Sequence, residues 1–136
     1  MATTAYVYDN RFTQHDTGIG HPERPERVRA IDEAVREASF FSQLVEVHPR
    51  KASNEEVALI HLPSYISRVR EEIDNKIHYL DSMDTPVCEH SYEIALLAVG
   101  AGLSLCDAII AGEASCGFAN IRPPGHHAER NYASGF

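Results

Sequence analysis

Residues 118–128 read FANIRPPGHHA and form the most informative segment of the chain. Its first four residues form a short, mostly apolar run that predicts a strand. Two prolines and a glycine follow and predict an irregular turn with a rigid backbone. Neighbouring side chains on a strand point to opposite faces, whereas in a turn both histidines can point into one cavity. The segment therefore predicts a strand whose end presents two imidazoles, those of His126 and His127.

Two further strands and four helices are predicted upstream. Short β-prone runs predict strands at residues 5–9 and 44–48. Apolar residues at helical spacing predict helices over 25–39, 57–61, from 63 onwards, and over 91–110. Ser53 and Glu56 form a capping-box signature, and Gly112 is expected to end the longest helix. Gly100 and Gly102 inside that helix suggest close packing against a sheet, because glycine is otherwise unfavourable there.

The alternation of strands and helices indicates the fold class. Strands separated by helices predict parallel βαβ units and a three-layer α/β architecture. In such sheets the active site lies at the carboxyl ends of the strands. The double histidine falls at one of these ends, in a chain expected to be one compact unit over residues 1–136.

Composition narrows the class of protein. The formal net charge of −8 argues against a general nucleic-acid surface, which would be basic. It would suit attraction of a cationic substrate, although most acidic cytosolic proteins have no such use for their charge. The absence of an apolar run of 18 or more residues argues against a membrane span. Residues 1–6 lack the pattern of a secretion signal. The three cysteines follow no metal spacing and are interpreted as half-buried, reduced thiols of a cytoplasmic protein.

The histidine pair has a chemical and a structural interpretation. An imidazole with an ordinary pKa of about 6.5 can take and return a proton at neutral pH, and two can divide proton transfer and charge tuning. Alternatively, two polar residues merely cap a loop. The preceding Arg-Pro-Pro-Gly and the strand before it favour the chemical interpretation.

Residues 122–128 resemble the active-site signature of the histone deacetylase superfamily. The resemblance is closest to its class II branch and to bacterial relatives such as acetylpolyamine amidohydrolases and acetoin-utilisation proteins. It continues through residues 129–136, and residues 21–27, 61–66 and 83–86 match further family segments. It thus extends over nearly the whole chain.

This resemblance implies an arginase/deacetylase α/β fold with strand order 2-1-3, and zinc-dependent hydrolysis of N-acetyl-lysine or an acetylated polyamine. His127 would be the general base and His126 its electrostatic partner. Phe136 would line the acyl channel, although ordinary core packing is the alternative. Asp84 would be a rim carboxylate that binds substrate, or simply a turn former. Arg27 would be the family's buried arginine near an internal cavity, or a surface helix residue.

Other polar residues are given less specific roles. Glu23 and Glu26 are expected to stabilise the first turn of a helix. The scattered histidines are expected at the surface or behind the site rather than as ligands: His15, His21, His48, His78 and His90.

The family's zinc ligands, an Asp-x-His segment and a later aspartate, do not occur in residues 1–136, nor does its catalytic tyrosine. The resemblance therefore implies the amino-terminal portion of a deacetylase domain, with no zinc bound to this chain alone and no expected activity. An uncovered sheet edge would favour a homo-oligomer. The alternative is a non-catalytic protein that binds itself or a partner. A third hypothesis, a cysteine hydrolase using Cys116 with either histidine, is disfavoured because Cys116 begins the strand that the histidines follow.

Overall fold

A computed structural model describes residues 3–136 and contains one parallel sheet. Its strands are β1 (Thr4–Val7), β2 (Val45–Val47) and β3 (Cys116–Ala119), in the spatial order β2-β1-β3. Both β2 and β3 pair with β1 in parallel. The predicted direction and order of the strands are therefore confirmed, whereas β1 and β3 begin and end one to two residues earlier than predicted. Met1 and Ala2, which begin the segment tested for a secretion signal, lie outside the described residues.

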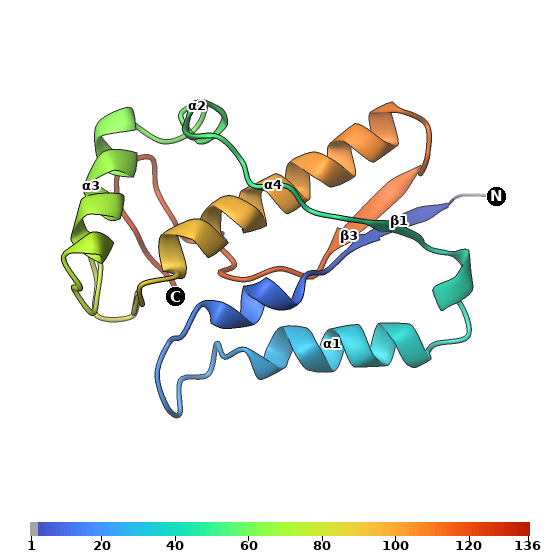
Figure 1. The fold of residues 1–136 in the computed structure, drawn as a ribbon, viewed down its shortest axis with the longest axis horizontal. Helices are drawn as coiled ribbons and strands as arrows, with labels where there is room; N and C mark the ends of the chain where they lie inside the picture. Colours follow the sequence, from blue (N-terminus) through green and yellow to red (C-terminus); the bar gives the residue numbers. More distant parts are fainter. Residues whose placement is uncertain (1–2) are drawn as a thin grey trace.

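Helices form the two layers around this sheet. α1 (Glu26–Glu37) covers one face and α4 (Ser91–Ile110) covers the other, as Figure 1 shows. α3 (Pro63–Asp74) lies beside the amino-terminal half of α4. The remaining elements are the 3-10 helices η1 (Asn10–Gln14) and η2 (Phe41–Gln43) and the short helix α2 (Asn54–Val57). The three-layer α/β class is confirmed, and α4 has the predicted bounds.

The starts of α1 and α2 can be compared with the local sequence signals that predicted them. Ser53 and Glu56 form the predicted capping box, with reciprocal hydrogen bonds of 3.1 and 2.8 Å. The helix after this cap is α2, so the prediction of a helix over 57–61 was wrong by several residues. Glu26 occupies the first turn of α1, as expected. Glu23 does not, because it lies in the loop before the helix and is buried.

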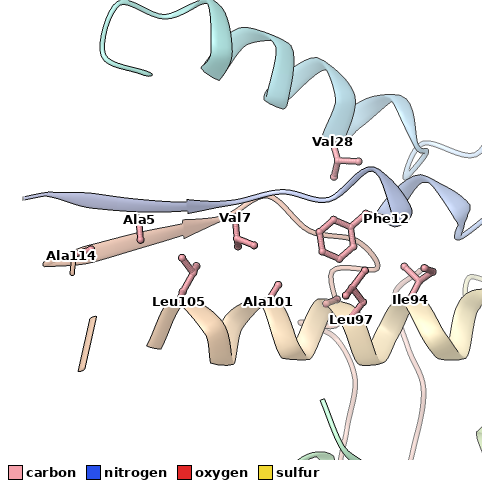
Figure 2. Packing of buried hydrophobic residues seen from close by; sticks show 10 residues of the cluster. Ala5, Val7, Phe12, Val28, Ile94, Leu97, Ala101, Leu105 and Ala114 are labelled. Carbon is pink, nitrogen blue, oxygen red and sulfur yellow. The ribbon is translucent and has the colours of Figure 1, made fainter. Parts of the chain in front are cut away.

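The main core lies between β1 and α4 (Figure 2). Ala5 and Val7 of β1 face a row of apolar side chains from α4: Ile94, Leu97, Ala101 and Leu105. Phe12 of η1 fills the space between them, and Val28 of α1 lies on the opposite side of the sheet layer. A second cluster, formed by Ile66, Ile73 and Tyr92, joins α3 to α4.

The glycines of α4 have different surroundings. A Cβ at Gly100 would overlap the carbonyl oxygen of Arg50 and lie 2.8 Å from the nitrogen of Ala52, whose N–H donates to Leu96 at 2.9 Å. Gly100 therefore allows contact with the loop after β2, rather than with the sheet as predicted. Around a Cβ at Gly102, the described residues leave 4 Å of open space, so that part of the prediction was also wrong. Gly112 has a φ of +78° where α4 ends, as predicted.

Two inferences from composition, on membrane spans and on the cysteines, can be compared with the structure. α4 is long and apolar enough to cross a membrane by length and composition alone, with a mean hydropathy of 1.9 over its most apolar 18 residues. Nine of its residues are buried within this fold, as is typical of a core helix. Of the cysteines, Cys88 is half-buried as expected, but Cys106 and Cys116 are exposed.

Candidate active site

The double-histidine turn begins at the carboxyl end of β3, where sequence reasoning placed it. Asn120 still donates its N–H to the carbonyl of Val7 at 3.0 Å, and the chain then leaves the sheet. The turn closes with a hydrogen bond of 3.0 Å from Ala128 N–H to the carbonyl of Gly125, which has a φ of +72°. The exposed rings of His126 and His127 lie with their centroids 4.3 Å apart. Both imidazoles are therefore available to a ligand.

The ring of His127 packs against the backbone of Gly135. A Cβ at Gly135 would lie 2.6 Å from Cγ of His127, so only glycine leaves room for the ring. Gly135 also has a φ of +73°, which favours glycine. The ring of Phe136 stands nearly perpendicular to His127, at 6.4 Å between centroids, and to His21, at 5.3 Å. Phe136 is half-buried and forms an aromatic wall beside the histidines.

Asp84 lies at the same wall. Its carbonyl accepts the N–H of Phe136 at 3.0 Å. Its exposed carboxylate accepts a hydrogen bond from the Ser82 hydroxyl, and this bond is the main cause that lowers the pKa of Asp84. Asp81 also links the loop that contains Asp84 to the segment that ends in Phe136, because its carboxylate accepts the N–H of Ala133 at 2.6 Å. Residues 81–84 and 126–136, two segments distant in sequence, therefore combine a negative charge, an aromatic face and two imidazoles.

A mainly apolar cavity of about 460 Å³ lies behind this wall, between α3, α4 and the turn. His126 and Phe136 line it on the side of the turn, and Tyr65 and Leu96 contribute from the two helices. His127 is not among its lining residues. The two histidines therefore have different surroundings although they are adjacent in sequence.

Arg27 lies apart from this cluster. Its Nη2 donates to the carbonyl of Ile121 at 2.8 Å, and its Nε donates to Glu23 at 3.1 Å. Its side chain is 37% exposed, so its position is intermediate between the two predicted alternatives. The fully buried arginine is Arg122, which directly precedes the turn.

Sequence reasoning missed the buried partner of Arg122. The guanidinium binds both carboxylate oxygens of Glu23, at 3.0 and 2.9 Å. Burial tends to raise the pKa of Glu23, but the hydrogen bonds and charge of Arg122 outweigh it, and the pKa is lowered. No local pattern reveals this pair, because its members are 99 positions apart.

His15 is buried behind the site, which is one of the two positions expected for it. Its Nδ1 lies 2.8 Å from the hydroxyl of Ser91 at the start of α4. Burial, with the nearby charge of Arg122 as a smaller cause, lowers the pKa of His15 to about 4. Its Nε2 is buried and has no hydrogen-bond partner among residues 3–136. His15 is therefore a neutral residue behind the turn, on the wall of the same cavity.

Residues 3–136 also bear on the expectations for a metal site and for a nucleophilic cysteine. Among the described residues, no three His, Cys, Asp or Glu side chains are grouped so that they could hold a metal ion. Cys116 lies at the start of β3, where its thiol contacts the hydroxyl of Thr4 at 3.3 Å. The histidine turn follows the other end of this strand, which speaks against the cysteine hydrolase hypothesis.

Comparison with known proteins gives consistent matches. Residues 21–136 match the model of the histone deacetylase domain. Polyamine deacetylase HDAC10 of Homo sapiens is 38% identical over 98% of this chain, which spans 21% of that protein. A probable deacetylase of Archaeoglobus fulgidus is 33% identical over 98% of the chain, which spans 37% of it. The crystal structure of the HDA15 HD domain superposes with a TM-score of 0.89 at 31% identity, covering 100% of this chain and 40% of that one.

Proposed function

The chain belongs to the histone deacetylase family, and from this premise we propose that the protein carrying it hydrolyses the acetyl amide of N-acetyl-lysine or of an acetylated polyamine. The observation that carries the proposal is the convergence of His126 and His127, Phe136 and Asp84 at one wall. The chain spans only 21% of the first relative, so the activity is proposed for the whole protein.

The proton-handling role falls to His127. Its exposed ring can take a proton from an attacking water molecule and return it to the departing amine. Contact with Gly135 and Phe136 fixes the orientation of the ring, as general acid–base catalysis requires. His126, 4.3 Å away between centroids, would adjust the charge at the pair.

The substrate-binding roles fall to Phe136 and Asp84. A flat aromatic face suits an aliphatic stem that ends in a polar amide. The lowered pKa of Asp84 keeps its exposed carboxylate ionised, so it can accept hydrogen bonds from the substrate or attract a cationic amine. These features support a substrate with an alkyl chain and a nearby N–H group or positive charge.

The zinc ion used by this family supplies Lewis-acid chemistry. Residues 3–136 do not fit a complete zinc site, because no suitable group of three ligands occurs among them. No catalytic step is therefore assigned through a metal, and the roles above concern proton transfer and substrate positioning only. That the isolated chain retains no stoichiometric zinc after dialysis stays a prediction, which elemental analysis can check.

Amine release from an acetyl-lysine peptide and from an acetylated polyamine tests the proposal in the full-length protein. His127→Ala is expected to lower kcat by about 10²–10⁴-fold, the usual contribution of general acid–base catalysis. His126→Ala should lower it less, and the exposed His90→Ala serves as the matched control. No amine release by the wild-type protein, or unchanged kcat in His127→Ala, would contradict the proposal. In the first case, analytical ultracentrifugation would test the alternative of a non-catalytic, self-associating protein.

A further inference from the structure

We propose that Glu23 is the positioning residue of the double-histidine turn, which it holds through a buried ion pair with Arg122. The inference deepens the proposed function, since it assumes that the turn carries the proton-transfer chemistry. It concerns a residue from the loop before α1, far from the turn in sequence.

The first evidence is the complete use of the Arg122 guanidinium. Its side chain is fully buried and makes five hydrogen bonds, as many as it has N–H groups. Nε and Nη2 donate to the carboxylate of Glu23 at 3.0 and 2.9 Å, and Nη2 also reaches the carbonyl of Glu23 at 3.5 Å. Nη1 donates to the carbonyls of Phe12, at 3.1 Å, and His15. Such a paired, planar contact fixes both position and orientation.

The second evidence is the place of this contact in the chain. Arg122 is followed by Pro123 and Pro124, whose rings restrict the backbone that leads to the histidines. Glu23 also binds Arg27, which holds the carbonyl of Ile121 at 2.8 Å. One carboxylate therefore fixes the two residues from which the turn starts.

The third evidence links the same loop to the aromatic wall. Nδ1 of His21 lies 3.1 Å from the nitrogen and 3.0 Å from the carbonyl oxygen of Glu23. The ring of His21 packs against Phe136, which in turn packs against His127. The position of Glu23 is thus connected to His127 both through the turn and through the wall.

Two variants of the full-length protein separate positioning from simple stabilisation. Glu23→Gln removes the charge and leaves Arg122 buried without its partner. We expect kcat to fall by about 10–100-fold with KM changed by less than about two-fold, because small misplacement of a catalytic group is costly. Glu23→Gln/Arg122→Met removes both charges. It should recover thermal stability but not kcat.

Glu26→Gln is the matched control, since this carboxylate is exposed and lies in the first turn of α1, shortly after Glu23. A double variant with wild-type kcat would overturn the proposal, and so would wild-type kcat in Glu23→Gln. If the wild-type protein releases no amine, the proposed function fails first. Histidine-ring NMR signals then test positioning alone: shifted or broadened His126 and His127 signals in the double variant support it, and unchanged signals overturn it.

Discussion

The core between β1 and α4 and the polar network behind the histidine turn are both buried, but different forces hold them. The core consists of aliphatic and aromatic side chains such as Val7, Leu97 and Phe12. The network consists of Arg122, Glu23 and neighbouring carbonyls, with every N–H of the guanidinium engaged. Hydrophobic contacts are non-directional, and the stabilisation that they provide decreases gradually with each buried atom removed. An ion pair depends on both partners, so the two regions should respond differently to substitution.

The largest expected effect breaks the network at one partner. Arg122→Met leaves the buried Glu23 with only the partly exposed Arg27 as a counter-charge and should lower the free energy of unfolding by about 3–5 kcal/mol. Adding Glu23→Gln should recover most of this loss, because no unpaired charge then remains. Urea unfolding of the single and double variants measures this. Additive losses would show that the pair behaves like the apolar core.

A substitution in the apolar core should lower the free energy of unfolding by a comparable amount, but no second substitution of a charged partner can restore it. Leu97 is fully buried, and Leu97→Ala is expected to cost about 2–5 kcal/mol through lost burial and a residual cavity. The loss should be the same at pH 5 and pH 7, since no titrating group is changed. Unfolding curves at both pH values check this. A strong pH dependence of the difference would contradict the contrast.

His15 should make the network sensitive to acid. Its pKa is lowered from 6.5 to about 4, because burial disfavours the charged form. Between these values the unfolded chain binds a proton that the folded chain does not, so stability falls as the pH falls. The expected contribution is about 3 kcal/mol between pH 7 and pH 4.

His15→Asn should flatten the pH dependence of stability across this window, because the side chain no longer titrates. Carboxylates such as Glu23 also lose their favourable contribution in acid, so the comparison is the difference between variant and wild type. The exposed His90→Asn serves as control. Identical slopes for His15→Asn and the wild type would show that His15 does not titrate in this manner.

The smallest expected changes in stability come from alanine substitutions at two glycines of α4. Gly100→Ala should cost about 1–3 kcal/mol, since the new methyl group would overlap the carbonyl of Arg50. Gly102→Ala should stabilise by up to about 1 kcal/mol, because alanine favours the helix and the space is open. Thermal unfolding distinguishes them. Equal changes would mean that the loop near Arg50 moves away easily.

The apolar region could be predicted from sequence because its signals are local. Helical spacing, with Gly112 as the expected end, predicted the bounds of α4, and Ser53 with Glu56 predicted the cap of α2. The FANIRPPGHHA segment also placed both histidines at the end of a strand. In each case the deciding residues lie within about one helix or strand of each other.

The polar region could not be predicted in the same way. Glu23 was predicted to stabilise the start of a helix from its local position alone. Its actual partner, Arg122, lies 99 positions away. The burial of His15 likewise depends on Ser91, 76 positions away. Gly100 was expected against the sheet, but its neighbour is the loop around Arg50. Local periodicity carries no information about such contacts, which arise only from the completed fold.

The separation of Glu23 and Arg122 also has a consequence for biosynthesis. Glu23 leaves the ribosome about 100 residues before Arg122 does. Its carboxylate therefore remains without Arg122 while α1 and α4 are synthesised. β3 and the turn can join only afterwards, beside a β1 strand that was translated first. The histidine turn should therefore be among the last parts of this segment to be ordered. Once α4 has left the ribosome, the apolar layers can begin to pack while the histidine site has yet to form.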